Sequence, residues 1–231
     1  MRRLAAALRC DIRIQYRNGF YAAAALVAAF WMPGLSRLPD AALARLLPPF
    51  LLSNLMINTF YFVAGQVLLE KDEGSLSMID VTPLRPHEYL ASKVGTLAFL
   101  SAAESLLIAL AAYGPGFRIP LFLAGIAAAS ALLTLAGFIV VSRYDSINAF
   151  LMPSALVVLA FAPPFLPYFG FAESRWMLLH PLQAPLGLLR AAFETRPAWE
   201  IAYALAWSGL WAAAALLLCK RALIRMRERK N

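Results

Sequence analysis

The chain has few charged residues and few of the side chains that build catalytic or metal centres. Asp, Glu, Lys and Arg make up only 15% of its 231 residues, and it has two cysteines and two histidines. With 61% hydrophobic residues and a mean hydropathy of +0.67, it lies far from the composition of a soluble globular protein. We therefore expect an all-α membrane protein.

Recognisable nucleotide and metal motifs are missing. There is no Gly-x-x-x-x-Gly-Lys-Ser/Thr phosphate loop, and the polar segments are too short for an ATPase domain. His87 and His180 fall on opposite sides of the membrane in the topology derived below, so we expect no metal site. Cys10 and Cys219 both fall on the cytoplasmic side, where reduction disfavours a disulfide. We expect no catalytic residue, no metal and no cofactor bound directly to this chain.

Long apolar runs are the dominant pattern. A helix needs about 20 mostly apolar residues to cross roughly 30 Å of hydrocarbon. The first 19 residues carry five arginines and no apolar core, which is unlike a cleaved signal peptide. The pattern predicts a polytopic domain of six transmembrane helices within residues 20–219, at Phe20–Leu35, Leu46–Leu69, Val94–Tyr113, Ile119–Val141, Ile147–Phe169 and Ile201–Cys219.

The positive charges predict the orientation of these spans. If the N-terminus is cytoplasmic, 15 of the 21 basic residues fall in cytoplasmic segments, in agreement with the positive-inside rule. Both termini are then cytoplasmic, in a multi-pass protein of the bacterial plasma (inner) membrane. The net charge of +8 reflects this topology and does not indicate nucleic-acid binding. Residues 220–231 form a basic tail suited to anionic lipid headgroups.

Residues 1–19 are predicted to form an amphipathic helix in the headgroup plane. Leu4, Leu8 and Ile12 lie on one side at helical spacing. This helix is either a simple anchor or an elbow that also contacts a cytoplasmic partner. The opposite side carries four arginines, namely Arg2, Arg9, Arg13 and Arg17.

The loop at residues 70–93 is the only charge-rich segment inside the apolar region. Gly74 is expected to end the helix of the second span, and Pro83 again disfavours helix continuation. Pro86 suits a first helical turn, and Glu88 two residues later faces the positive helix end. These features predict a compact, structured loop that offers a contact surface for another protein.

The sequence of this loop resembles type 2 ABC export permeases. The likeness extends over the chain in its amphipathic first helix, six spans and long outer segment. Residues 137–148 and 166–170 are further similar to permeases named as fluoroquinolone exporters. The loop residues that carry the resemblance are Glu70, Glu73, Gly74, Ser75, Thr82, Pro83, Leu84, Arg85, Glu88, Tyr89, Leu90, Ser92 and Lys93.

The resemblance implies a permease subunit of an exporter that moves a small molecule, possibly a drug, across the membrane. ATP and Mg²⁺ would be bound and hydrolysed by a separate ABC subunit that docks on the loop. A second permease copy or paralogue would complete the pathway, as a homodimer or a heterodimer. The resemblance implies a coupling role for Glu70, Glu73, Gly74, Ser75, Pro83, Leu84, Arg85, Glu88, Tyr89 and Lys93.

Glu104 lies near the middle of the third span. A carboxylate at that depth is costly and usually faces a bundle interior or a water-filled cavity. It either contributes to a substrate pathway with Gln66 and Asn58, or accepts hydrogen bonds from Gln66, Asn54, Asn58 or Thr134 as a structural contact. A proton-coupled secondary transporter using Glu104 is the alternative function. A membrane-embedded enzyme would need a second ionisable group at similar depth, and none is evident.

The segment at residues 170–200 follows a cluster of three prolines, Pro163, Pro164 and Pro167, at the outer end of the fifth span. Proline ends or kinks a helix, so we expect short helices at the outer surface. They form either an outer cap or a re-entrant gate.

Overall fold

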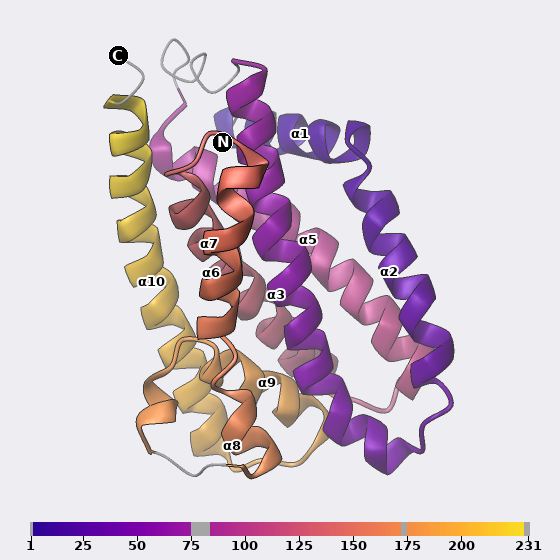
Figure 1. Ribbon diagram of the computed structural model, residues 1–231. Coiled ribbons are helices and arrows are strands. Elements are labelled where there is room, and N and C mark those ends of the chain that lie inside the picture. Colours follow the sequence, from indigo (N-terminus) through magenta and orange to yellow (C-terminus); the bar gives the residue numbers. More distant parts are fainter. Residues whose placement is uncertain (1, 75–83, 172–174, 229–231) are drawn as a thin grey trace.

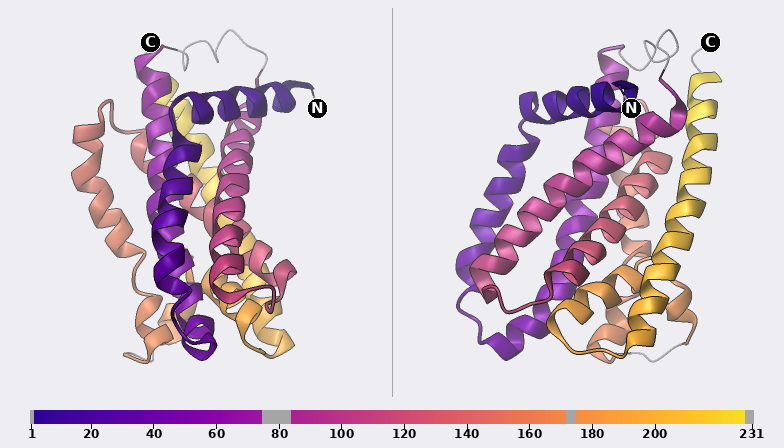
Figure 2. Two further views of the ribbon diagram at one scale, coloured as in Figure 1. Left: turned by 90° about the vertical axis from the view of Figure 1, so that its right-hand side faces the viewer. Right: turned by 180° about the vertical axis from the view of Figure 1, so that it is seen from behind.

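The computed structural model describes residues 2–74, 84–171 and 175–228. Over these residues the regular secondary structure is entirely helical. Most of the helices run along a common direction, and α1 lies across the end of the bundle at which the chain begins (Figure 1). The last turns of α3 and α10 and the first turn of α5 lie at the same end (Figures 1 and 2). The all-α membrane-protein class is thus confirmed.

The helix bounds match several of the predicted spans. α2 covers Phe20–Leu35 and α6 covers Ile119–Val141, as expected. The second and third predicted spans form the longer helices α3 and α5. α1 precedes these four helices in the sequence, and α7, α8, η2, α9 and α10 follow them. The bounds of these elements are α1 Arg2–Arg17, α3 Asp40–Asp72, α5 Pro86–Tyr113, α7 Ile147–Ala160, α8 Phe165–Phe169, the 3-10 helix η2 Arg175–Leu179, α9 Gln183–Phe193 and α10 Ala198–Glu228.

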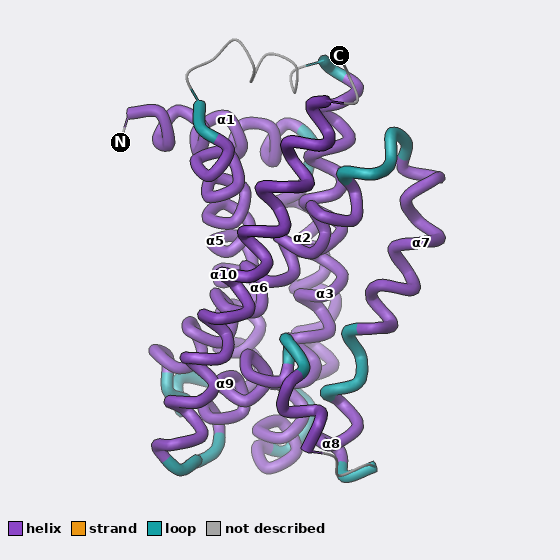
Figure 3. Tube along the Cα trace, turned by 90° about the vertical axis from the view of Figure 1, so that its left-hand side faces the viewer, coloured by secondary structure: helices purple, strands orange, loops and turns teal. Residues whose placement is uncertain are grey.

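The fifth predicted span, Ile147–Phe169, is wrong as one continuous helix. α7 ends at Ala160 and α8 begins only at Phe165. Pro163 and Pro164 lie in this break and cannot donate backbone hydrogen bonds to a continuing helix. The 14 residues of α7 span about 21 Å at 1.5 Å per residue. α7 lies at the side of the bundle (Figure 3), where Phe150 packs on Phe60 and Ser154 donates to the Tyr61 hydroxyl of α3.

Four of the described helices are long and apolar enough to cross a membrane, namely α3, α5, α6 and α10. The pair α1 and α2 passes the same test only together, and the two helices meet at an angle of 61°. α7 is apolar but shorter. The molecule is therefore a polytopic membrane protein with four or five candidate spans by length and composition.

α10 continues beyond the predicted end of the sixth span. The sequence pattern separated a span ending at Cys219 from a basic tail at residues 220–231, whereas the helix continues to Glu228. Cys219, Leu223 and Met226 are buried along this extension and pack against α6 and its neighbours. The arginines between them therefore project from a helix that the core holds in place.

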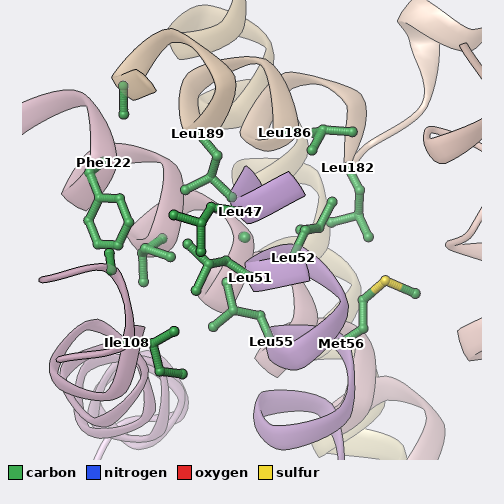
Figure 4. Close-up of a cluster of buried hydrophobic side chains, with 14 of the residues drawn as sticks. Leu47, Leu51, Leu52, Leu55, Met56, Ile108, Phe122, Leu182, Leu186 and Leu189 are labelled. Carbon is green, nitrogen blue, oxygen red and sulfur yellow. The ribbon is translucent and has the colours of Figure 1, made fainter. Parts of the chain in front are cut away.

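α6 lies at the centre of the bundle, against α3, α5, α9 and α10. Leucines of α3 meet α9 and α6 in the largest apolar cluster (Figure 4). Leu186 and Leu189 bring α9 into this cluster, and both are buried. The short helix α9 is therefore part of the core at the end of the bundle opposite α1 (Figure 1), and not a loose cover over it.

Two glycines of α6 allow its neighbours to approach closely. A Cβ atom on Gly137 would lie 2.6 Å from Val63 Cγ1 and 2.8 Å from the Phe60 carbonyl oxygen. A Cβ atom on Gly125 would lie 2.9 Å from Leu189 Cγ. Small residues at helix interfaces permit such close backbone packing in membranes. The positions of α3 and α9 against α6 thus depend on these glycines.

Candidate functional site

The residues predicted to couple to a partner lie at the end of α3 and the start of α5. These ends flank residues 75–83, so Ser75 and Pro83 lie outside the described residues. Leu84 contacts a cluster formed by the ends of α3, α5, α6 and α10. α1 lies across the same end of the molecule (Figure 2). Three segments that are distant in sequence therefore meet where the loop leaves and re-enters the bundle.

Both ends of the loop have the turn chemistry that the sequence predicts. α3 ends at Asp72, and Gly74 has φ +69°, a conformation that glycine adopts without strain. α5 starts at Pro86, and the Glu88 carboxylate accepts a hydrogen bond from the Arg85 backbone N–H at 2.9 Å. The prediction that Pro86 and Glu88 begin this helix is confirmed. The loop is therefore held at two defined points.

A buried ionic network joins α1, α3 and α5 beneath the loop. Lys93 Nζ lies 2.6 Å from Glu70 Oε1 and 3.1 Å from Asp11 Oδ1. The Lys93 side chain is 1% exposed, and the two carboxylate side chains are 8% and 6% exposed. Removing Lys93 would leave two buried carboxylates without a cation, which is strongly destabilising. The network therefore holds three helices in one arrangement.

Two hydroxyl groups complete this network. The Tyr89 hydroxyl donates to Glu70 Oε2 at 2.6 Å, and the Ser92 hydroxyl donates to Asp11. The Lys93 ammonium also lies over the Tyr89 ring, 4.7 Å from its centroid. Tyr89 and Lys93, both predicted coupling residues, thus contact Glu70, a third one. Because each charge has several partners, the geometry of the network is tightly defined.

The buried face of α1 differs from the predicted apolar stripe. Ile12 is 46% exposed, whereas Asp11 and Gln15 are 4% and 0% exposed. Gln15 Nε2 donates to Thr96 Oγ1 of α5 at 2.9 Å. The predicted stripe is therefore only partly right: Leu4 and Leu8 are partly buried, but Ile12 is exposed, and polar groups of α5 hold Asp11 and the amide nitrogen of Gln15. α1 is attached to the bundle as well as lying at its surface.

A groove of about 330 Å³ runs beside the network. Arg17 pairs with Glu73 across it, and both side chains are substantially exposed. Partial burial raises the pKa of the Cys10 thiol, and the neighbouring Asp11 and Glu70 carboxylates raise it further. The groove is lined by Ala7, Cys10, Asp11, Arg13, Ile14, Arg17, Glu70, Glu73, Leu84, Tyr89 and Ser92.

A second contact ties the end of α3 to the segment between α6 and α7. Lys71 Nζ lies 3.0 Å from Asp145 Oδ1 and donates to the Tyr144 carbonyl oxygen. The Lys71 side chain is 5% exposed, whereas that of Asp145 is 90% exposed. The polar segment after α6 therefore contacts the end of α3 from which the loop starts.

Glu104 forms a separate polar contact within the bundle. It accepts hydrogen bonds from Asn54 Nδ2 at 3.0 Å and from Asn58 Nδ2 at 2.9 Å. All three side chains are buried between α3 and α5. Gln66 is fully buried but is not part of this contact, and neither is Thr134. Of the hydrogen-bond donors expected for Glu104, the structure therefore shows Asn54 and Asn58.

Sequence reasoning missed the two α1 residues that reach the site. Asp11 is the only acidic residue among the first 39, a signal that a charge count along the segment would have found. Gln15 follows it by one helical turn on the same face. Neither Glu70 nor Lys93 was expected to be a partner of α1.

These features define a polytopic helical membrane protein in which the ends of α1, α3 and α5 are joined by buried charges at one end of the bundle. The match to a family profile extends over residues 2–228, and the chain belongs to the fluoroquinolones export permease protein family. Two proteins of Mycobacterium tuberculosis, from different strains, are each 32% identical to it over 225 residues. The alignments cover 96% of this chain and 94% of each relative, and both relatives are named fluoroquinolones export permease protein.

Proposed function

We propose that this chain is the membrane-spanning permease subunit of an ABC exporter. A separate ATP-binding subunit docks on residues 70–93 and on α1, and it binds and hydrolyses ATP with Mg²⁺. The chain has no ATPase site of its own in this proposal. Membership of the export permease family supports the transport role. The buried Asp11–Lys93–Glu70 network supports the coupling role, and it is the observation that carries the proposal.

The buried ion pairs give a path by which a movement of the loop would reach α1, α3 and α5. A force applied to the loop reaches the last turn of α3 and the first turns of α5 directly. Lys93 connects both helices to α1 through two buried ion pairs. Since a buried pair is costly to break, the three helices move together when the partner closes on ATP.

The proposed topology has six crossings and cytoplasmic termini, in the bacterial inner membrane. α2 and α7 are counted as crossings although each is short by itself. The basic residues of α1 and of the end of α10 lie at one end of the bundle, as the positive-inside rule requires (Figure 1). Their placement supports this orientation.

The proposed cargo is a small molecule carried between two permease subunits. The two relatives are named for fluoroquinolones, so we propose a drug of this class as the first substrate to test. The partner permease is a second copy or a paralogue. Glu104 and Asn58, which lie together between α3 and α5, are the proposed pathway residues.

The decisive experiment is purification of the tagged chain from its native host in mild detergent, followed by identification of the accompanying proteins. We expect an ATP-binding subunit in stoichiometric amount. The variant Arg85→Ala/Glu88→Ala should lose that subunit and export, yet remain in the membrane. Glu88→Gln is the matched control because glutamine preserves the cap on the Arg85 N–H.

Export by Arg85→Ala/Glu88→Ala at the normal rate would contradict docking through this loop. A preparation that exports in vesicles without ATP or any ATP-binding subunit would instead support a proton-coupled transporter.

A further inference from the structure

A basic hollow of about 420 Å³ lies between the end of α6 and α10, away from the loop site. Three arginines line it. Arg221 and Arg225 are one helical turn apart on α10 and therefore share a face. Arg143 follows directly after α6. The hollow therefore gathers positive charge from α10 and from the segment that follows α6.

This charge is not neutralised by the part of the chain that the structure describes. Arg143, Arg221 and Arg225 are exposed, and none of the ion pairs among the described residues includes them. Arg17 and Arg190, in contrast, each pair with a glutamate. The three arginines are therefore available to an anion from outside the chain.

The floor of the hollow is apolar and continues along the bundle. Ile139 and Leu218 line the basic hollow and also a second one of about 140 Å³. The second hollow is lined by apolar and aromatic side chains, including Ala136, Ala215 and Trp211. The two hollows therefore lie next to each other along α6 and α10, one basic and the other apolar, and we call the two together the groove.

The length of the groove corresponds to one leaflet of a bilayer. Arg221 and Trp211 are ten residues apart on α10, or about 15 Å at 1.5 Å per residue. Half of a hydrocarbon core of roughly 30 Å is the same length. A molecule with an anionic head and one long apolar chain fits both parts of the groove.

We propose that this groove binds an anionic phospholipid of the cytoplasmic leaflet. Its phosphate contacts Arg143, Arg221 and Arg225, and an acyl chain lies along Ile139 and Leu218 towards Trp211. Basic pockets between membrane helices on the cytoplasmic side recognise anionic headgroups in this way. A free phosphate or an acidic protein surface would use the arginines and leave the apolar part of the groove unused.

The test is native mass spectrometry of the full chain in a neutral detergent, titrated with phosphatidylglycerol or phosphatidylcholine. We expect retained phosphatidylglycerol and little phosphatidylcholine. Arg221→Gln/Arg225→Gln should raise the apparent Kd for phosphatidylglycerol by roughly twenty- to thirty-fold, since each basic group near an anionic lipid contributes about a five-fold factor. Arg9→Gln/Arg37→Gln removes the same charge outside the groove and should leave the Kd nearly unchanged.

A second variant separates a lipid from a free phosphate. Ala136→Phe fills the apolar part of the groove, so it should weaken phosphatidylglycerol binding and leave the arginines intact. Glycerol 3-phosphate should compete poorly with the lipid. Elution of every variant at the volume of the parent protein establishes that each is folded.

Four results would overturn the proposal. Equal retention of both lipids would show nonspecific binding. Equal weakening by the control double variant would assign the effect to net charge. Effective competition by glycerol 3-phosphate, or loss of an ATP-binding subunit from Arg221→Gln/Arg225→Gln with unchanged lipid binding, would assign the arginines to a different ligand.

Discussion

Lys93 of α5 and Glu70 of α3 form an ion pair with 2.6 Å between Nζ and Oε1, and each side chain is at least nine-tenths buried. The two residues stand on either side of the loop, 23 positions apart. Asp11 of α1 approaches the same ammonium group at 3.1 Å. The base of the loop is therefore a single cross-linked unit of three helices.

Replacing Lys93 should be severely destabilising. Lys93→Met leaves two buried carboxylates without a cation, and loss of one partner of a buried pair costs about 3–5 kcal/mol. The measurement is the thermal unfolding midpoint of the purified protein in detergent. The neutral triple variant Asp11→Asn/Glu70→Gln/Lys93→Met is the control and should recover much of the loss. A midpoint for Lys93→Met equal to that of the parent would contradict the network.

Asp11 and Arg17 should differ in their effect although both belong to α1. Asp11→Ala removes a buried partner of Lys93 and Ser92 and should lower the free energy of unfolding by about 1–3 kcal/mol. Arg17→Gln breaks an exposed pair with Glu73, which contributes less than about 1 kcal/mol. Denaturation of the two variants side by side tests the contrast. Equal effects would show that burial does not decide the contribution.

Gly137 should not tolerate a side chain. In Gly137→Ala the new Cβ would lie 2.6 Å from Val63 Cγ1 and 2.8 Å from a carbonyl oxygen, so α3 and α6 must separate. Such overpacking costs about 1–3 kcal/mol. Gly209→Ala on α10 is the matched control because its Cβ would meet no atom within 4 Å. It should be neutral or stabilising by up to about 1 kcal/mol, since alanine favours the helix. Comparable losses in both would argue against the close approach.

Glu104 permits a test that separates structure from transport. Glu104→Leu leaves the Asn54 and Asn58 amides without their acceptor and should cost about 1–3 kcal/mol. Glu104→Gln retains one acceptor oxygen and should be less destabilising. The measurements are thermal stability and drug export for both variants. A stable Glu104→Gln protein without export would assign the negative charge to the pathway, and normal export would leave Glu104 a structural contact.

The sequence predicted the helical class, the bounds of α2 and α6, and the turn chemistry at both ends of the loop. These features depend on local patterns, namely apolar run length, glycine and the position of Pro86 before Glu88. A break near Pro163 and Pro164 was expected, but the span was still drawn through to Phe169, because apolar composition continues past the prolines. Run length alone does not distinguish a continuous helix from an interrupted one.

The proposed coupling residues came from the family resemblance, but their contacts within the chain did not. The helical wheel of α1 placed Leu4, Leu8 and Ile12 on one side; the structure exposes Ile12 and buries Asp11 and Gln15. Polar residues are favourable inside only where another segment supplies a matching group. That group lies 81 or more residues further along the chain, on α5.

The sequence by itself thus determined that the chain is helical, that it is suited to a membrane, and where the loop and the basic segments lie. The composition and run lengths of single segments are sufficient for those properties. Only the tertiary structure decided that Lys93 joins three helices, that Glu104 meets two asparagines, and that Arg143 shares a groove with Arg221 and Arg225. Each of these contacts depends on how separate helices pack, which is set by close approaches such as that at Gly137.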